Sequence, residues 1–523
     1  MSEQPIQPIQ PLDVEYHRSW ETDKSFNDVL ADTLSKAPYL LVSLAIHGLG
    51  ALILAGFAFL RSQEQEAPTI EMAAAPPPPE IEEPEEEPEE IVEEIIEEPV
   101  LQETEMEEVE QETVEEMGDP DFLSDAPFDS DAWNNDVGLG GGAGGLRGGR
   151  GGRGGRKGGD ATEKAVAAAL KWLHDHQAPE GFWDCDEFMY YDKFPDKTAS
   201  DGPGSPVNDV GDSGLALLAF LGHGNTMSEG KYKEDVVRGV NWLKSNQLDN
   251  GLFGDEVGNP TLYNHSIATM AMGEAYYFGK SPILLIPLKK AIGTITRSRN
   301  EYTVWRYSLT PNGDNDTSIT GWMVFALETA HDSGLEVDSA IFRDSEDWFD
   351  TMTDSLGRCG YNMEAQAGSR PSRPRAYIER FPPDKSEALT AVALLCRIFM
   401  TDTDKVKRWN DHPKYEVMKK HADLLVETLP LWDAEGGSCD FYYWYYGTFA
   451  LNQWGGDHWK KWKKAIETAM LDNQRMEDPE DNFYGSWDPV GPWGEDGGRV
   501  YTTAIGALIL EVYYRYGRVL GAR

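Results

Sequence analysis

The feature that most constrains this chain is a twelve-residue pattern that occurs twice. Residues 172–183 read WLHDHQAPEGFW and residues 242–253 read WLKSNQLDNGLF, an offset of 70 positions. In both, an aromatic–Leu pair is followed by Gln and then by Gly-x-aromatic. Self-similarity at a long period is typical of repeat folds, in which each unit buries its apolar face against the next. We therefore expect one repeat architecture for most of the chain.

After residue 160 the sequence alternates two kinds of helical pattern. One kind is amphipathic, as in EKAVAAALKWLHDHQ, and the other is apolar on nearly every side, as in SGLALLAFLGHG. Six such pairs follow one another. Because six amphipathic helices can enclose six apolar ones, the pattern predicts an all-α fold, an α6/α6 toroid of helix pairs, over residues 160–523. An open solenoid is the alternative, but it would leave the apolar helices at its ends uncovered.

An uncharged stretch precedes this domain. Residues 38–60, PYLLVSLAIHGLGALILAGFAFL, exceed the roughly 20 residues that cross a bilayer core, so we expect one transmembrane helix after a cytoplasmic tail of residues 1–37. A cleavable signal peptide is the alternative, although no A-x-A site follows. Basic residues are more frequent before the span than just after it, which favours a cytoplasmic amino terminus. The expected location is the bacterial inner membrane, single-pass, with the toroid in the periplasm.

Two low-complexity segments connect the span to the toroid. Between Arg61 and Arg147 there are 29 Asp or Glu and no Lys or Arg, a charge run that cannot collapse into a core. Residues 61–137 are therefore predicted to be a disordered, acidic Pro/Glu-rich spacer, and residues 138–159 a Gly/Arg-rich linker. Arg-Gly-Gly repeats can bind nucleic acid, but a position outside the cytoplasm leads us to expect no nucleic-acid partner.

The cysteines indicate no zinc site. Cys185, Cys359, Cys396 and Cys439 are far apart and form no CxxC pair. We expect them to be small buried residues, with one disulfide left open in an oxidising compartment. The sequence predicts neither a metal nor a cofactor.

The Gln-to-aromatic spacing resembles the QW motif of squalene cyclases and of the wider terpenoid cyclase and prenyltransferase superfamily. Gln177 and Gln247 are then expected to hold helix-end backbone groups, while Trp183 and Phe253 pack over the turn. A looser third copy, NFYGSWD, spans residues 482–488. With the anchor, spacer and linker, the phrases GDNDTSITGW, CDFYYWYYGT and GGRVYTTAI resemble the membrane-anchored bacterial prenyltransferase/squalene-oxidase repeat proteins. That group is defined by its repeats and not by a reaction.

The predicted span contains an ionisable side chain. Ser43 and His47 lie one turn apart, and an ionisable group at membrane depth is usually retained for a partner or a proton path. This Ser-x3-His face, together with the Pro/Glu-rich segment, resembles the anchor of TonB-type energy transducers. The resemblance implies coupling to the subunits of a proton-driven motor complex. A plain anchor with a neutral, hydrogen-bonded His is the alternative.

The same resemblances bear on catalysis. Squalene cyclases protonate their substrate with an Asp-x-Asp-Asp-Thr cluster, and residues 313–317, GDNDT, are the corresponding stretch. Asn315 stands where the proton-donating Asp belongs, which leaves Asp314 and Asp316 as candidate acids. Protein prenyltransferases hold zinc through Asp, Cys and His. Tyr443 stands where that His belongs and DTSITGW holds no cysteine, so zinc-dependent prenyl transfer is not expected.

The starts of the apolar helices are expected to converge at one mouth of the ring. The residues placed there as a candidate cavity are Asp212, His265, Asp316, Trp322, Glu387, Tyr442, Tyr443, Trp444, Arg499 and Tyr501. Convergent aromatic and carboxyl groups can hold a glycan, a lipid or a peptide. The alternative is that the Asp side chains cap helices and the aromatic side chains fill the core.

Three functions fit these patterns. The first is a membrane-anchored periplasmic binding or scaffold protein, whose non-catalytic toroid recognises a cell-envelope component. The second is a diverged terpenoid-cyclase-fold enzyme, an isomerase or lyase acting on an isoprenoid or another lipid. The third is a TonB-like protein coupled to a proton-driven membrane motor.

Overall fold

The structure is a computed structural model that describes residues 160–367, 373–513, 515 and 519–520. This part is helical, with two isolated β-bridges and no β-strand among its residues. The predicted all-α fold is confirmed. The tail, membrane span, spacer and linker predicted before residue 160 lie outside the described residues, and no described helix is both long and apolar enough to cross a membrane.

Twelve of the α-helices in the described part of the chain form two sets of six. The outer helices are α3 (Asp160–Asp175), α5 (Lys233–Ser245), α7 (Leu285–Ser298), α9 (Ser339–Met352), α12 (Tyr415–Glu427) and α14 (Gly456–Leu471). The inner helices are α4 (Asp209–Gly222), α6 (Pro260–Gly279), α8 (Thr317–Asp332), α11 (Ala388–Phe399), α13 (Phe441–Trp454) and α15 (Gly494–Leu510). The shorter segments are α10 (Arg375–Arg380), η1 (Phe188–Tyr191), η2 (Pro206–Asn208), η3 (Pro282–Leu284), η4 (Pro383–Lys385), η5 (Trp409–Asp411) and η6 (Glu511–Tyr513).

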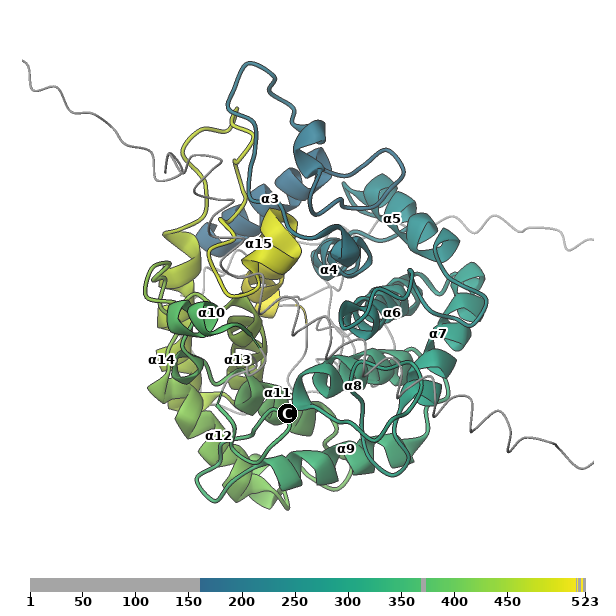
Figure 1. Ribbon diagram of the computed structural model, residues 1–523, viewed down its shortest axis with the longest axis vertical. Helices are drawn as coiled ribbons and strands as arrows, with labels where there is room; N and C mark the ends of the chain where they lie inside the picture. The colour runs from purple at the N-terminus through teal and green to yellow at the C-terminus, as the bar shows by residue number, and fades with distance from the viewer. Residues whose placement is uncertain (1–159, 368–372, 514, 516–518, 521–523) are drawn as a thin grey trace, which may run out of the picture. The chain divides into compact units, whose positions relative to one another are not determined.

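The inner helices close a ring. They contact one another in the order α4, α6, α8, α11, α13, α15 and back to α4, and the outer helices surround them (Figure 1). Each outer helix packs mainly on the inner helix that precedes it in the chain, and α3, the first, packs on α15, the last. The structure is therefore a closed α6/α6 toroid, and the open solenoid is excluded.

Burial separates the two sets as the sequence patterns require. Every residue of α8 from Thr317 to Ala330 is buried, so this helix has no solvent face. Outer helix α9 instead buries Ile341, Ser345, Phe349 and Met352, which recur every three or four residues on a single stripe. A helix that is apolar on all sides thus belongs to the inner set, because its whole surface is covered only in the interior of the ring.

The repeated Gln residues join neighbouring units. Gln177 Nε2 donates to Gly181 O (2.8 Å) and Asp235 O (3.0 Å), which ties its own turn to α5. Gln247 makes the corresponding pair of bonds, to its turn and to the backbone of α7, at 3.0 and 2.9 Å. Each Gln amide therefore connects its own turn to the first turn of the next outer helix.

A third Gln closes the ring. The sequence pattern placed a loose copy at residues 482–488, but the glutamine of that unit is Gln474, displaced by a longer turn. Its Nε2 donates to Gly485 O within the turn and to Ala165 O on α3, both at 2.8 Å. Arg515, just beyond α15, donates to Leu218 O on α4 at 2.6 Å. Polar bonds therefore accompany the apolar contacts that join the first and last units.

Aromatic side chains fill the middle of the ring. Trp322 on α8 stacks on Tyr445 of α13, with ring centroids 5.8 Å apart and an interplanar angle of 12°. Tyr446 meets Trp322 edge-on at 5.4 Å and Phe325 at 5.7 Å. Because α11 separates α8 from α13 around the ring, these contacts cross its interior. Part of the candidate cavity is consequently occupied by packed rings.

Candidate functional site

Asp316 is the most unusual side chain at the N-terminal ends of the inner helices. Its Oδ1 accepts a hydrogen bond from Ile319 N (2.9 Å) and so caps α8, while Oδ2 is buried and makes no hydrogen bond. Arg306 Nε lies 3.8 Å from Oδ2. Burial raises the pKa of Asp316 to about 7, against the opposing effects of the Ile319 hydrogen bond and the Arg306 charge. At neutral pH this carboxyl can hold or release a proton.

Aromatic and hydroxyl groups surround Asp316. Tyr442 Oη lies 2.8 Å from Ser318 Oγ, and Ser318 follows Asp316 by two residues. The ring of Trp493, which immediately precedes α15, meets Tyr442 edge-on at 6.1 Å, and its Nε1 is buried without a hydrogen-bond partner. Burial, followed by the nearby Asp316 charge, raises the pKa of Tyr263 well above its ordinary value. Tyr263 therefore stays a neutral hydroxyl beside Asp316.

Asp212 lies at the start of α4 and has a similar environment. Its side chain is 4% exposed and its Oδ2 has no hydrogen-bond partner. Burial, and then the charge of Asp209, raises its pKa well above the ordinary value. Tyr501 on α15 lies within electrostatic reach of both Asp212 and Tyr442, so it links the two sides of the site. We use the name inner-helix cluster for Asp212, Tyr263, Asp316, Ser318, Trp322, Tyr442, Trp493 and Tyr501.

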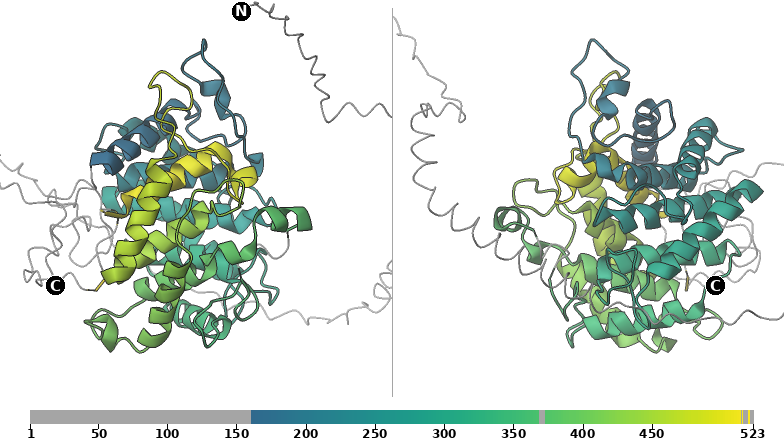
Figure 2. Two further views of the ribbon diagram at one scale, coloured as in Figure 1. Left: turned by 90° about the vertical axis from the view of Figure 1, so that its left-hand side faces the viewer. Right: turned by 45° about the vertical axis from the view of Figure 1, so that its right-hand side comes forward.

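A strap of residues 373–381, which includes α10, lies against the cluster. Arg373 Nη2 donates to Asp496 Oδ2 at 2.7 Å, and its guanidinium lies 5.1 Å from the ring of Tyr377 and 5.4 Å from that of Trp493. Tyr377 donates its hydroxyl hydrogen to Pro492 O. Figure 2 (left) shows α10 standing out at the edge of the ring. The strap is thus attached beside Trp493 by a few half-exposed contacts.

Replacing Arg373 with Ala is expected to loosen the strap. An ion pair at this exposure and a cation–π contact each contribute up to about 1 kcal/mol. Their loss should therefore speed hydrogen exchange of the α10 amides by about tenfold without changing the α13 amides. Arg375→Ala is the control, because Arg375 is exposed and its ion pair is with Glu379. Equal exchange of α10 in both variants would show that Arg373 does not hold the strap.

Several residues predicted for the cavity serve other contacts. Asp314, predicted as a candidate acid, is exposed at 60% of its side chain, so only Asp316 of that pair is buried. His265 Nδ1 accepts from Phe253 N (3.1 Å) and Nε2 donates to Ala291 O (3.2 Å). Because its two nitrogens bond to the backbone of the turn before α6 and of α7, His265 connects inner helix α6 to the outer helices. Burial lowers the pKa of His265 to about 4.

Three more predicted residues form structural bonds. Glu387 pairs with Arg358, whose Nε lies 2.9 Å from Oε1. Arg499 donates from Nε to Asp201 O at 2.7 Å, which pins the loop before α4. Tyr443 donates to Thr428 O (2.9 Å) at the end of α12.

Trp444, also predicted for the cavity, is a packing residue, and a glycine shapes the nearby start of α15. Trp444 packs on Phe441 and Trp432, with ring centroids 5.3 and 6.2 Å away. Gly498 lies at the bend in α15 with a positive φ of 62°, and a Cβ there would lie 2.4 Å from Gly204 N, so glycine is required at this position. The structure therefore brings together Asp212, Asp316, Trp322, Tyr442 and Tyr501. The other predicted residues make structural contacts or are exposed to solvent.

Four residues at this site, Tyr263, Arg306, Ser318 and Trp493, were not predicted from the sequence. Tyr263 and Ser318 lie in the first turns of α6 and α8, and Trp493 directly precedes α15. The rule that selected Tyr442 and Tyr501, proximity to the start of an inner helix, applies equally to these three. Arg306 lies in the long turn before α8, where no periodic pattern indicates its direction.

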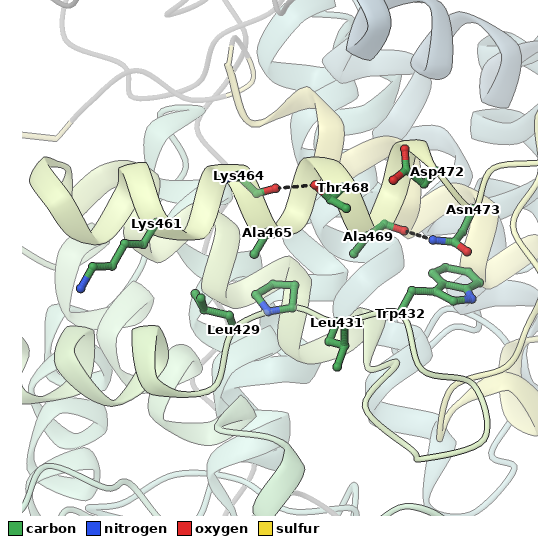
Figure 3. A pocket seen from close by; sticks show the side chains of 11 residues that line it. Leu429, Leu431, Trp432, Lys461, Lys464, Ala465, Thr468, Ala469, Asp472 and Asn473 are labelled. Carbon is green, nitrogen blue, oxygen red and sulfur yellow. Dashed lines mark hydrogen bonds between the residues drawn. The ribbon is translucent and has the colours of Figure 1, made fainter.

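A cleft of about 380 Å³ lies on the outer surface. Leu429, Leu431 and Trp432 face the side of α14, with Lys461 and Lys464 on that helix (Figure 3). The cleft is open and mostly apolar, and its carboxylate, from Asp472, is at one end. It lacks the buried titratable groups that distinguish the inner-helix cluster, so we place the candidate functional site at the cluster.

Two groups of side chains in the described residues each bring three metal-ligand atoms within 4.8 Å of one another. One is Cys185, Asp186 and Asp209, and the other is Glu328, His331 and Asp332. All four cysteines are free and buried.

No family model and no curated protein sequence matches the chain. Solved structures with a similar chain path include an α-1,6-mannanase from Salegentibacter, 10% identical, with a TM-score of 0.45, over 68% of this chain and 99% of that one. A type II terpene cyclase from Scytonema is 11% identical with a TM-score of 0.41, over 68% and 98%. An unsaturated glucuronyl hydrolase specific for heparin is 14% identical with a TM-score of 0.43, over 68% and 96%. The assignment as a toroid rests on the helix contacts themselves.

Proposed function

We propose that the chain is a binding protein of the cell envelope and that its toroid holds a glycan at the inner-helix cluster. The observation that carries this proposal is a set of buried polar atoms without hydrogen-bond partners near aromatic rings: Asp316 Oδ2, Asp212 Oδ2 and Trp493 Nε1. Buried polar groups are nearly always hydrogen-bonded, so such a set fits a ligand that supplies the missing partners.

The chemistry of the cluster favours a sugar over a lipid. Sugar hydroxyls both donate and accept, which suits an indole N–H, tyrosine hydroxyls and a carboxyl that can be neutral, such as Asp316. The apolar faces of sugars pack on aromatic rings such as those of Trp493 and Tyr442. An isoprenoid chain would leave the same polar atoms buried and unsatisfied, at a cost of about 1–3 kcal/mol each.

Binding of envelope oligosaccharides tests the proposal. The full chain in detergent is titrated by calorimetry with a panel of neutral and acidic oligosaccharides from bacterial cell walls. Trp493→Phe keeps the aromatic ring but removes the N–H, and is expected to weaken binding about tenfold. The control is Trp409→Phe, which changes a half-buried tryptophan stacked on Trp454 at the outer surface. The proposal fails if no oligosaccharide binds, or if Trp493→Phe binds as tightly as the control.

A second candidate function is acid catalysis by Asp316, in a diverged enzyme of this fold. The favouring observation is its pKa near 7, the range in which a general acid works best at neutral pH. If the full chain converts a glycan or a polyprenyl substrate, Asp316→Asn should lower turnover by at least about 100-fold while binding persists. Unchanged turnover in that variant would eliminate Asp316 as the acid.

Anchoring and motor coupling are proposals about residues outside the described part. We propose that residues 38–60 hold the toroid at the periplasmic side of the inner membrane, and that Ser43 and His47 contact a proton-driven motor complex. Motor subunits should then co-purify with the wild-type chain and not with His47→Ala. Co-purification that persists in His47→Ala would count against the coupling.

A further inference from the structure

The loop after α3 and the start of α4 together form a group of metal-ligand atoms. Cys185 Sγ and carboxylate oxygens of Asp186 and Asp209 all lie within 4.8 Å of one another. Cys185 N donates to Asp209 Oδ1 at 3.0 Å, and this bond fixes the loop against the first turn of the helix. The sulfur is fully buried and both carboxylates are partly buried. The group is therefore held in place by the fold and is not a chance meeting of mobile surface side chains.

The negative charge of this group has no cationic partner. Among the described residues, Asp184, Asp186, Asp209 and Asp212 form no ion pair with Lys, Arg or His. Two other buried carboxylates of the toroid are paired with arginines, Glu387 with Arg358 and Glu274 with Arg515. Carboxylates that share a partly buried site favour a cation, because a bound ion offsets both their repulsion and their lost hydration.

Asp212 provides an independent observation. Only 4% of Asp212 is exposed, and its Oδ2 has no hydrogen-bond partner. It follows Asp209 by three residues on α4, so the two side chains lie on the same helix face. Among the charges acting on the Cys185 thiol, that of Asp212 has the largest effect. The Asp212 carboxyl, which carries an unsatisfied buried oxygen, therefore lies near the three ligand atoms, on the helix face that also holds Asp209.

We propose that Cys185, Asp186 and Asp209 bind one divalent transition-metal ion, with Asp212 accepting a hydrogen bond from a water on that ion. A thiolate with two carboxylates suits Zn²⁺ among the common divalent ions, whereas Mg²⁺ and Ca²⁺ take oxygen ligands. Three protein ligands and one water complete a tetrahedral shell. The thiol now donates its hydrogen to Ser205 O, and the ion takes the place of that proton when it binds.

Co²⁺ is the probe, because a cobalt–thiolate bond gives a charge-transfer absorption band that carboxylates alone do not give. The metal-free full chain in detergent is titrated with CoCl₂, and we expect a band that saturates at one ion per chain and disappears on adding ZnCl₂. Cys185→Ser should abolish the band. Cys439→Ser is the matched control, since Cys439 is equally buried but belongs to no such group, and should keep it.

Two further variants separate ligation from folding. Asp186→Asn changes a half-buried loop residue, so the fold should persist, as circular dichroism would show, while Co²⁺ affinity falls at least about 100-fold. Asp212→Asn should weaken affinity about 10- to 100-fold, as loss of an outer hydrogen-bonding partner does. The proposal is overturned if the folded wild-type chain gives no band, or if the band survives Cys185→Ser. The cobalt band and the Cys185 and Asp186 variants report on metal alone, whereas Asp212 belongs to both proposed sites.

Discussion

Replacing Asp316 with Asn is expected to stabilise the protein at pH 8 by about 4 kcal/mol. The pKa of Asp316 is about 7 in the folded state and about 3.9 in an unfolded chain, and three pKa units correspond to this energy. Below pH 4 both states carry the proton and burial costs little. As the pH rises from 4 to 7 the unfolded state ionises first, so the wild-type chain loses stability. Asn has no charge to bury and still caps α8.

Urea unfolding followed by tryptophan fluorescence at two pH values measures this effect. The advantage of Asp316→Asn should be about 4 kcal/mol at pH 8 and about 1–2 kcal/mol at pH 5. Asp314→Asn is the matched control, because Asp314 lies two residues earlier in the same turn and is exposed. A variant that is less stable than wild type at pH 8 would show that Asp316 is held ionised and is favourably paired.

This prediction also bears on function. A carboxyl that lowers stability across the neutral pH range contributes nothing to folding that Asn would not supply. Residues that break a local rule of stability are commonly found at functional sites. Asp316 is therefore the residue at which stability and ligand binding, or acid catalysis, are expected to oppose each other.

Replacing Trp322 with Ala is expected to lower the free energy of unfolding by about 3–5 kcal/mol. Trp322 is 4% exposed and lies between α8 and α13 in the middle of the ring, where it stacks on Tyr445. Its removal leaves a cavity that six separately anchored helices cannot easily close. The loss should therefore include both the burial of the indole and the cost of the remaining void.

The same unfolding experiment measures this loss, with Trp409→Ala as the control. Trp409 is half-buried at the outer surface and stacks on Trp454, so its removal should cost about 1 kcal/mol. Trp322→Phe should fall between the two, since part of the volume and one aromatic face remain. A loss below about 1 kcal/mol for Trp322→Ala would mean that the middle of the ring is not a packed core.

The alternation of helices and the closure of the ring could be predicted from the sequence, because both depend on the burial of apolar side chains. The apolar periodicity of α8 and α9 differs, and that difference alone assigns one to the inside and the other to the outside. Gln177 and Gln247 were expected to hold helix-end backbone groups, whereas their bonds to the next outer helix were not predicted from the sequence. Gln474 was missed because its turn is longer than theirs, which breaks the spacing without changing the contact.

The functional sites could not be predicted in the same way. The direction in which a side chain points near the start of a helix depends on the elements packed around it. Tyr442 and Tyr443 are adjacent, yet one bonds to Ser318 inside the ring and the other to the end of α12 outside it. The proposed metal-binding group of Cys185, Asp186 and Asp209 could not be predicted from the spacing of ligand residues, because 23 positions separate Asp186 from Asp209.

The sequence by itself determined that twelve helices alternate between amphipathic and apolar, and hence that they close into a toroid, because apolar surface must be covered. Only the tertiary structure decided which polar groups are left buried without partners. That outcome depends on the precise approach of loops and helix ends that are distant in the chain, and hydrogen bonds and ion pairs are decided over a few ångströms.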